Sequence, residues 1–411
     1  MALNIQKYPN TNGKHLIIPI LLTLVYFVAS MIILNNNYKF FLLVPLCLTL
    51  VILKLLWDKS NHVLTLVFTF SVVASIAILL RFSNKNNMAN ELQLLYNRYQ
   101  YVNDSNHQMF THLATTSQYN VFFLETNFER NEFSTKQLCA IESAAKTNPR
   151  GKIFVSSIKS QFFNFDLIKQ YPNLVWLKFK PIELFRNTPL WPWWTNGQVF
   201  RSSFTSAHIS DAARLAILFK YGGFYSDLDT IAMKSFEALS YKSGAGYLNE
   251  NGESLGNGFL HFTKGHSFLE FLMNEFQLKY NPAYWGGNGP TLLIDSMQTY
   301  CKFDDFFRAL MNKTLNDTFK LNDHKCKDLI IYPETFFYPY TYKNGELEIL
   351  FRKNAFINIS KIIDSYSIHF YGSLSNKYQV GINDFSLYEY LAAQNCPIIY
   401  EHVKRNEIKF Y

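Results

Sequence analysis

Two aspartates, Asp227 and Asp229, stand two residues apart directly after a short β-prone segment, residues 224–226. In an extended chain, side chains two residues apart point to the same side, so we expect both carboxylates to face one point. Paired carboxylates with open coordination positions suit Mn²⁺ or Mg²⁺ bound together with a diphosphate. Such an ion would neutralise charge on a departing nucleoside diphosphate, which is Lewis-acid catalysis.

A D-x-D pair alone is a weak signal, because a solvated acidic turn explains an isolated match better. The residues before the pair favour a functional interpretation. Residues 210–221 have apolar side chains at helical spacing, with Ser210 as the expected N-cap. Asp211 and Arg214 lie three apart and therefore project from one helix face. A Gly-Gly pair then allows a sharp reversal into the β-prone segment.

This succession of helix, Gly-Gly turn, strand and D-x-D resembles the sugar-binding region of retaining GT-A glycosyltransferases, most closely the alpha-1,4-glycosyltransferase family. Two later runs are similar to the same family: N-G-F-x-x-F-x-K-G-H at residues 257–266 and W-G-x-N-G-P at residues 285–290. The resemblance implies an α/β fold, with a GT-A type nucleotide-sugar-binding domain built on a mostly parallel central sheet. It also implies Mn²⁺ or Mg²⁺ as the cofactor.

The resemblance assigns roles to residues at matching positions. Catalysis and metal binding would fall to Asp229 and Asp227, and Asn288 would line the reaction centre. The first strand of such a domain lies under the uridine, which adds the end of the segment FFLET to the donor site. The expected donor contacts are Asp211, Arg214, Tyr225, Asn257, Glu125 and Thr126.

His369 is the candidate third metal ligand. Residues 366–371 alternate in hydrophobicity like a strand, and imidazole is an ordinary ligand for a first-row divalent cation. The family that the chain resembles has a histidine in this region. The competing interpretation is a core histidine that is satisfied by one hydrogen bond. By contrast, we expect His266 to have a structural role at the start of a helix.

Residues 190–204 contain an unusual density of aromatic side chains. Aromatic faces pack against the C–H faces of sugars, so Trp193 and Trp194 are the expected acceptor contacts. Ordinary packing in the core or in a lid explains the same residues equally well.

The resemblance implies transfer of Gal or GalNAc from a UDP-sugar, with retention and in alpha linkage (alpha-1,4), to a glycolipid such as lactosylceramide. A same-face attack, in which the leaving phosphate oxygen takes the proton, requires no protein base. Two alternatives stay open. One is an alpha-mannosyl- or N-acetylglucosaminyltransferase that acts on glycoprotein glycans. The other is a membrane-anchored sugar-binding protein without catalytic activity.

The elements around these residues indicate how they are positioned. Residues 121–126 and 153–156 are short apolar strands, and a helix at residues 135–145 with Ser134 as its cap lies between them. This βαβ order predicts a parallel sheet, and ligands bind at the ends of such strands. Residues 258–262 are strand-like and lead into an amphipathic helix at residues 264–272.

The composition points to a membrane. The chain is 48% hydrophobic but only 17% charged, and its net charge of +8 is spread along the sequence, which gives no indication of nucleic-acid binding. Three apolar runs, residues 15–34, 38–57 and 63–80, each approach the ~20 residues that cross a bilayer. A buried helical bundle is the alternative for these runs.

The predicted organisation is therefore a membrane region at residues 1–82, a polar stem at 83–116 and a GT-A catalytic domain at 117–411. The resemblance implies a Golgi membrane protein with a cytosolic N-terminus and a luminal catalytic domain. Three spans keep that sidedness, whereas two would reverse it.

Four cysteines fall in the predicted catalytic domain. Cys301 and Cys326 bracket a polar loop and could pair; Cys139 and Cys396 could pair if the fold brings them together. The family generally has a further cysteine where this chain has Asn127, which leaves the partner of Cys139 open. Glycosylation sequons occur at Asn103, Asn312, Asn316 and Asn358.

Overall fold

The computed structural model describes residues 119–159, 162–240, 245–248, 255–302, 319–320, 326 and 328–411. The predicted membrane spans at residues 15–34, 38–57 and 63–80 and the predicted stem lie outside these residues. Within the described residues, no helix combines the length and the apolar character that crossing a bilayer requires.

The first unit of the fold is the predicted βαβ unit. Strand β1 (Asn120–Glu125) pairs in parallel with β2 (Lys152–Ser157), and helix α4 (Thr135–Thr147) connects them. Ser134 caps α4 as expected: its side chain accepts from the Gln137 amide, while the Gln137 side chain accepts from the Ser134 amide. The parallel sheet predicted from this order is confirmed.

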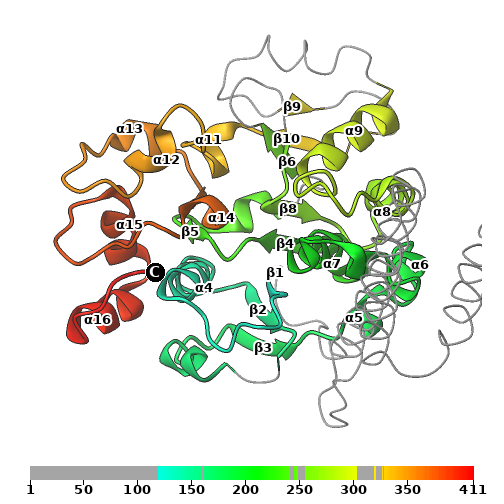
Figure 1. The fold of residues 1–411 in the computed structure, drawn as a ribbon. Helices are drawn as coiled ribbons and strands as arrows, with labels where there is room; N and C mark the ends of the chain where they lie inside the picture. Colours follow the sequence, from blue (N-terminus) through cyan, green and yellow to red (C-terminus); the bar gives the residue numbers. More distant parts are fainter. Residues whose placement is uncertain are drawn as a thin grey trace, which may run out of the picture. The chain divides into compact units, whose positions relative to one another are not determined.

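The central sheet has five strands in the order β3-β2-β1-β4-β8. Strands β3 (Leu174–Lys178), β2, β1 and β4 (Gly223–Ser226) run parallel, and β8 (Phe259–Phe262) closes the sheet antiparallel to β4 (Figure 1). The expectation of a mixed α/β fold with a mostly parallel sheet is therefore confirmed.

Helices cover both faces of this sheet. Alternate side chains of β1 point to opposite faces, and each set packs against a different helix. Phe122 and Leu124 pack in one hydrophobic cluster with helix α7 (Thr205–Tyr221). Val121 and Phe123 pack in a second cluster with α4. The sheet thus lies between α4 and α7, which are labelled on either side of it in Figure 1.

Helix α7 begins earlier than the sequence suggested. It starts at Thr205, after Phe204 as the N-cap residue, so the predicted cap Ser210 lies inside the helix. The Ser210 hydroxyl instead accepts from the Arg214 guanidinium one turn later, at 3.0 Å. The predicted end is correct, since Gly222 and Gly223 both have positive φ angles, +67° and +106°. A Cβ on Gly223 would lie 2.5 Å from the Asn120 carbonyl oxygen.

A two-stranded antiparallel ribbon brings the C-terminal part of the chain to the end of β4. Strand β11 (Ser367–His369) pairs with β5 (Thr230–Ala232), and His369 lies opposite Thr230. The strand expected within residues 366–371 is confirmed for its central residues. This pairing places an imidazole directly beside the aspartates that precede β5.

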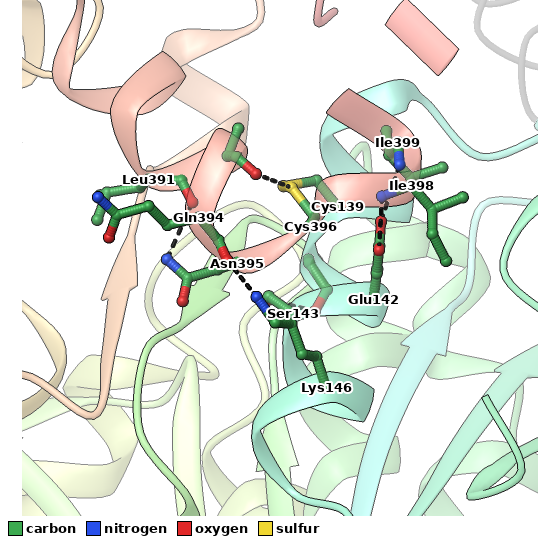
Figure 2. Close-up of a disulfide and its surroundings, with 12 residues drawn as sticks. Cys139, Glu142, Ser143, Lys146, Leu391, Gln394, Asn395, Cys396, Ile398 and Ile399 are labelled. Atoms are coloured by element: carbon green, nitrogen blue, oxygen red, sulfur yellow. Dashed lines mark hydrogen bonds between the residues drawn. A yellow bond between two sulfur atoms is a disulfide. The ribbon is translucent and has the colours of Figure 1, made fainter. Parts of the chain in front are cut away.

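Two disulfides tie distant segments together: Cys139 with Cys396, and Cys301 with Cys326. The first joins α4 to the start of α16 (Pro397–Arg405), as Figure 2 shows. One turn along α4, the buried Glu142 carboxylate accepts from the amides of Ile398 and Ile399 at 2.8 and 2.9 Å. It thereby caps the N-terminus of α16, where a negative charge is favourable.

The other described elements complete the domain around this core. A second sheet has the order β7-β6-β10-β9. Its strands are β6 (Ala245–Leu248), β7 (Leu255–Gly256), β9 (Phe319–Lys320) and β10 (Ile330–Tyr332). The remaining α-helices are α5 (Pro181–Phe185), α6 (Trp191–Thr195), α8 (Ser267–Lys279), α9 (Pro290–Cys301), α11 (Glu334–Phe337), α12 (Glu346–Ile349), α13 (Ile359–Ile362), α14 (Gly372–Ser375) and α15 (Leu387–Asn395). His266 is the N-cap of α8, and its side chain accepts from the Phe268 amide, so its predicted structural role is confirmed.

Candidate active site

A cavity of about 1210 Å³ opens at the carboxyl ends of β1 and β4. Glu125, the last residue of β1, and Asp227, the first residue after β4, both line it. In open α/β sheets, ligands bind at this edge because the strands end there and the following loops diverge. The cavity therefore occupies the place where the sequence predicted a ligand.

Three side chains that line the cavity converge on one point. Asp227, Asp229 and His369 each offer a ligand atom, and these atoms lie within 4.8 Å of one another. His369 Nε2 is 3.1 Å from Asp229 Oδ1 and 3.6 Å from Asp227 Oδ2. The backbone differs from the expected extended segment: β4 ends at Ser226, and the turn into β5 carries both aspartates. The convergence depends on that turn and on the β5–β11 pairing.

The donor set fits a divalent cation. Two carboxylate oxygens and one imidazole nitrogen are ligands that Mn²⁺ accepts readily, and they leave further positions open. Burial by itself would lower the pKa of His369, but the charges of Asp229 and Asp227 outweigh it and raise this pKa to about 9. The site thus holds two negative charges close enough to attract a cation, whether that cation is a proton or a metal ion.

Backbone groups hold the two aspartates in position. The Gly372 amide donates to Asp229 Oδ2, and the Phe370 amide donates to the Asp229 carbonyl at 2.8 Å. The Asp227 amide donates to the Gly258 carbonyl, also at 2.8 Å. Gly258 itself is tightly enclosed, because a Cβ there would lie 2.8 Å from Asp227 Oδ2 and 3.0 Å from His369 Nε2.

Arg214 lies between two carboxylates instead of projecting freely into the cavity. Its guanidinium is 3.3 Å from Asp211 Oδ1 and 3.3 Å from Asp227 Oδ1, and it donates to the Asn257 carbonyl at 2.7 Å. Burial would raise the pKa of Asp227, but Arg214, His369 and Tyr225 together outweigh that effect and lower this pKa to about 2. Arg214 borders the cavity, but with these contacts it mainly keeps Asp227 ionised and oriented.

Three expected donor contacts surround this arginine and line the cavity. Asp211 Oδ1 accepts from the Asn257 amide at 2.9 Å. The Tyr225 hydroxyl donates to Asp227 Oδ1, and its ring lies under the Arg214 guanidinium, 4.6 Å away. Burial raises the pKa of Asp211 to about 6, although Arg214 and Asn257 oppose this shift.

The two predicted donor contacts at the end of β1, Glu125 and Thr126, differ in whether they reach the cavity. Glu125 lines the cavity, and its carboxylate lies 3.1 Å from Arg130 Nε and accepts from Gln137 at 2.9 Å. Thr126 is buried outside the cavity lining and donates to the Ser206 carbonyl at 2.8 Å. Its position supports the junction of β1 with α7 and offers no group to a ligand.

Three predicted residues lie elsewhere than expected. Asn288 is buried outside the cavity lining; its amide accepts from the Asn281 amide and donates to the Asn281 carbonyl, so it fixes a loop and does not face the reaction centre. Trp193 and Trp194 are 0% exposed and pack around Phe185 in the core. The packing interpretation of the two tryptophans is the one that the structure supports, because a sugar cannot reach a side chain without exposed surface.

Other residues of the site were missed from the sequence. The Tyr338 ring lies 5.1 Å from the His369 ring. Lys136 lines the cavity from the first turn of α4, where burial lowers its pKa to about 8. Tyr284 and Trp285 border the cavity and are 52% and 49% exposed. Only the last two carried a usable signal, since they stand directly before a Gly-rich run.

Comparison with known families divides the described domain into two matching regions. Residues 134–245 match the family described as "Glycosyltransferase sugar-binding region containing DXD motif". Residues 261–403 match the family described as "Alpha 1,4-glycosyltransferase conserved region". The first region contains the D-x-D pair, and the second contains His369.

Characterised relatives are similar over most of their length. Lactosylceramide 4-alpha-galactosyltransferase is 27% identical over 299 residues in Homo sapiens and 26% identical over 295 residues in Mus musculus; each match covers 69% of this chain, with 77% and 76% of the relative. Alpha-1,4-N-acetylglucosaminyltransferase of Homo sapiens is 28% identical over 295 residues, which cover 68% of this chain and 79% of the relative.

Solved glycosyltransferase structures are similar at lower levels. PaToxG glycosyltransferase is 15% identical with a TM-score of 0.35, and covers 57% of this chain and 84% of its own. Galactosyltransferase LgtC, in complex with donor and acceptor sugar analogues, is 11% identical with a TM-score of 0.29, and covers 62% of this chain and 87% of its own.

Proposed function

Because this chain belongs to the family of alpha-1,4-glycosyltransferases that carry a DXD sugar-binding region, we propose that it transfers a hexose from a UDP-sugar to a glycolipid acceptor. The donor sugar is Gal or GalNAc, the new bond is an alpha-1,4 linkage, and the catalytic domain, residues 117–411, has the GT-A type of fold. The observation that carries this proposal is the convergence of Asp227, Asp229 and His369 in the lining of a cavity.

The roles of the residues follow from their contacts. Asp227, Asp229 and His369 hold the cation, for which we propose Mn²⁺ or Mg²⁺. A cation bound there supplies Lewis acidity that neutralises the charge on the departing diphosphate. Arg214 keeps Asp227 ionised, and Asp211 and Asn257 present polar groups to hydroxyls of the donor sugar.

The transfer itself balances without a protein base. The acceptor hydroxyl attacks C1 of the sugar on the face from which UDP leaves. A C1–O bond to the acceptor forms as the C1–O bond to UDP breaks, and a phosphate oxygen of UDP takes the hydroxyl proton. This course retains the alpha configuration. The chain's contribution is to orient the two substrates and to exclude water.

A second donor is favoured by one specific observation. The human relative that transfers N-acetylglucosamine is 28% identical, slightly above the 27% of the human galactosyltransferase. UDP-GlcNAc is therefore the alternative donor, and a glycoprotein glycan is then an alternative acceptor. Both alternatives use the same proposed metal ligands, Asp227, Asp229 and His369, and the same transfer with retention.

The test is a donor screen of the full chain in detergent with Mn²⁺. UDP-Gal, UDP-GalNAc and UDP-GlcNAc are each offered with lactosylceramide and other glycolipids, and UDP release and glycolipid product are measured. We expect one donor to give product, and Asp229→Ala to reduce the rate at least about a hundredfold, because it removes a ligand of the cation.

The matched control is Asp295→Ala, which removes an exposed aspartate on α9 outside the cavity lining. It should leave the rate unchanged. Circular dichroism and the melting temperature show whether each variant remains folded. A folded Asp229→Ala variant with wild-type activity contradicts the proposal, as does a wild-type protein that transfers from none of these donors.

A further inference from the structure

A buried histidine, His208, contacts the loop between α8 and α9, residues 281–289, and holds it in place. His208 on α7 is 0% exposed, and Asn288 Nδ2 lies 3.2 Å from its Nε2. His208 also hydrogen-bonds the backbone of Tyr284 and Trp285. The backbone at the two aromatic residues is thereby fixed to the helix that carries Asp211.

The glycines of the loop determine how its aromatic side chains lie. The Gly287 amide donates to the Tyr284 carbonyl at 3.3 Å, which closes a tight turn. A Cβ on Gly287 would lie 2.3 Å from the Tyr284 ring, so that ring rests directly on the Gly287 backbone. Gly286, next to Trp285, has no atom within 4 Å of the position of a Cβ. Tyr284 and Trp285 are both about half exposed and line the cavity, but only the Tyr284 ring is held against the loop backbone.

The Trp285 side chain is 49% exposed and lines the cavity, whereas Trp193 and Trp194 are 0% exposed. Together with the half-exposed Tyr284 beside it, Trp285 gives the cavity wall a contiguous exposed aromatic surface, which is typical of a ligand-binding groove. The loop also reaches the donor residues, since a Cβ on Gly289 would lie 3.0 Å from Asp211 Oδ1 and 2.5 Å from Asn257 Nδ2. Trp285 thus borders the cavity on the same loop as Gly289, which contacts the side chains proposed to hold the donor sugar.

We propose that Trp285 is the acceptor platform of this enzyme and stacks its indole on the C–H face of the acceptor's terminal sugar. Tyr284, held against Gly287, supports the platform from within the loop. This inference rests on the proposed function. It replaces Trp193 and Trp194 as acceptor contacts, because the C–H face of a sugar needs an exposed aromatic face of the kind that only Trp285 offers among these three tryptophans.

The kinetic test compares Trp285→Ala, Trp285→Phe and the wild type in the full chain. Trp285→Ala should raise KM for the acceptor at least about tenfold, the size of effect expected when one aromatic anchor is lost. KM for the UDP-sugar and the slow hydrolysis of the UDP-sugar without acceptor should stay unchanged. Trp285→Phe keeps an aromatic face and should recover most of the loss.

The control is Phe356→Ala, which removes an aromatic side chain that is 88% exposed and lies outside the cavity lining. It should leave both KM values unchanged. An unchanged acceptor KM in Trp285→Ala overturns the proposal, and so does an equal loss for donor and acceptor, since that pattern indicates a general disturbance of the site.

A binding measurement separates this inference from the proposed function. Acrylamide quenching of tryptophan fluorescence is measured with and without a disaccharide panel that includes lactose, in the wild type and in Trp285→Phe. Protection in the wild type that disappears in Trp285→Phe supports the platform, even if no donor gives transfer and the proposed function fails. If no disaccharide protects the wild type, the platform is wrong even though the enzyme is active.

Discussion

Arg214 illustrates how a single buried charge organises the site. A guanidinium that is 5% exposed is costly unless it is paired, and Arg214 meets Asp211, Asp227 and the Asn257 carbonyl. Its planar fork can serve several acceptors at once, which a lysine ammonium cannot do in the same geometry. The sequence indicated the pair Asp211–Arg214, but the link from Arg214 to Asp227 required the helix and the strand end to meet.

We expect Asp211 to make the activity dependent on pH. Burial raises its pKa to about 6, so its carboxylate takes up a proton as the pH falls through that value. If the charged form holds the donor, kcat/KM should fall about tenfold per pH unit below 6. The measurement is kcat/KM for the UDP-sugar between pH 5 and about 8, in the wild type and in Asp211→Asn.

The sign for stability is opposite to that of a carboxylate in an ordinary ion pair. The folded-state pKa of Asp211 lies above its ordinary value of 3.8, so the folded protein binds the proton more tightly. The charged side chain therefore costs stability above pH 6, and that cost is relieved as the pH falls from 6 towards 3.8. If kcat/KM of Asp211→Asn falls below pH 6 in the same way as that of the wild type, a group other than Asp211 causes the fall.

At the scale of elements, the three proposed metal ligands, Asp227, Asp229 and His369, are brought together by the way three segments approach one another. The turn after β4 carries two ligands, the β5–β11 ribbon brings the third, and residue 258 before β8 fills the space between them. Gly258 is needed there because no side chain fits. A Cβ would meet Tyr338 Oη at 2.7 Å and Asp227 Oδ2 at 2.8 Å. Tyr338 is buried, and Asp227 is held by Tyr225 and Arg214, so neither side chain can move away easily.

Gly258→Ala should therefore displace the ligands without removing any of them. We expect Mn²⁺ affinity to fall by about tenfold to a hundredfold, as when groups that orient metal ligands are altered. Isothermal titration calorimetry of Mn²⁺ in the presence of UDP measures this. Gly286→Ala is the matched control, since a Cβ there meets nothing within 4 Å, and it should bind Mn²⁺ like the wild type. Equal affinity in both variants would mean that the segments can shift at little cost.

At the scale of the whole molecule, two disulfides indicate the compartment in which the domain folds. Cys139 pairs with Cys396 and Cys301 with Cys326, and disulfides persist in oxidising compartments such as the lumen of the secretory pathway. The bond between α4 and α16 acts together with Glu142, which caps α16 in the same place (Figure 2). We propose that residues 1–82 anchor the chain in the Golgi membrane, that residues 83–116 form a stem, and that the catalytic domain is luminal.

Asn358 tests that orientation. It stands in the sequon Asn358-Ile359-Ser360, and its side chain is exposed at the start of α13. A luminal domain should carry a glycan there, because the glycosylation machinery acts only in the lumen. Endoglycosidase treatment of the expressed full chain should increase its gel mobility, and Asn358→Gln should lose one step of that shift. A chain that endoglycosidase leaves unchanged in all variants would contradict a luminal domain.

The sequence by itself determined the local elements and the D-x-D pair. Four predicted features rest on short-range preferences, which act between neighbours in the chain. They are the cap at Ser134, the βαβ order, the Gly-Gly turn and the strand around His369. His369 could be nominated because imidazole is a common ligand, and the ribbon then placed it beside Asp229. These parts could be predicted since each depends on a few consecutive residues.

Only the tertiary structure decided which polar and aromatic side chains reach the cavity. Trp193, Trp194 and Trp285 are alike in sequence terms, yet two are buried and one is half exposed, because burial depends on elements that are distant in the chain. Asn288 and Asn257 both precede glycines, but Asn288 turns towards His208 and Asn281, whereas Asn257 reaches Asp211. Residue type and spacing gave the chemistry of the site, and packing selected the residues that carry it.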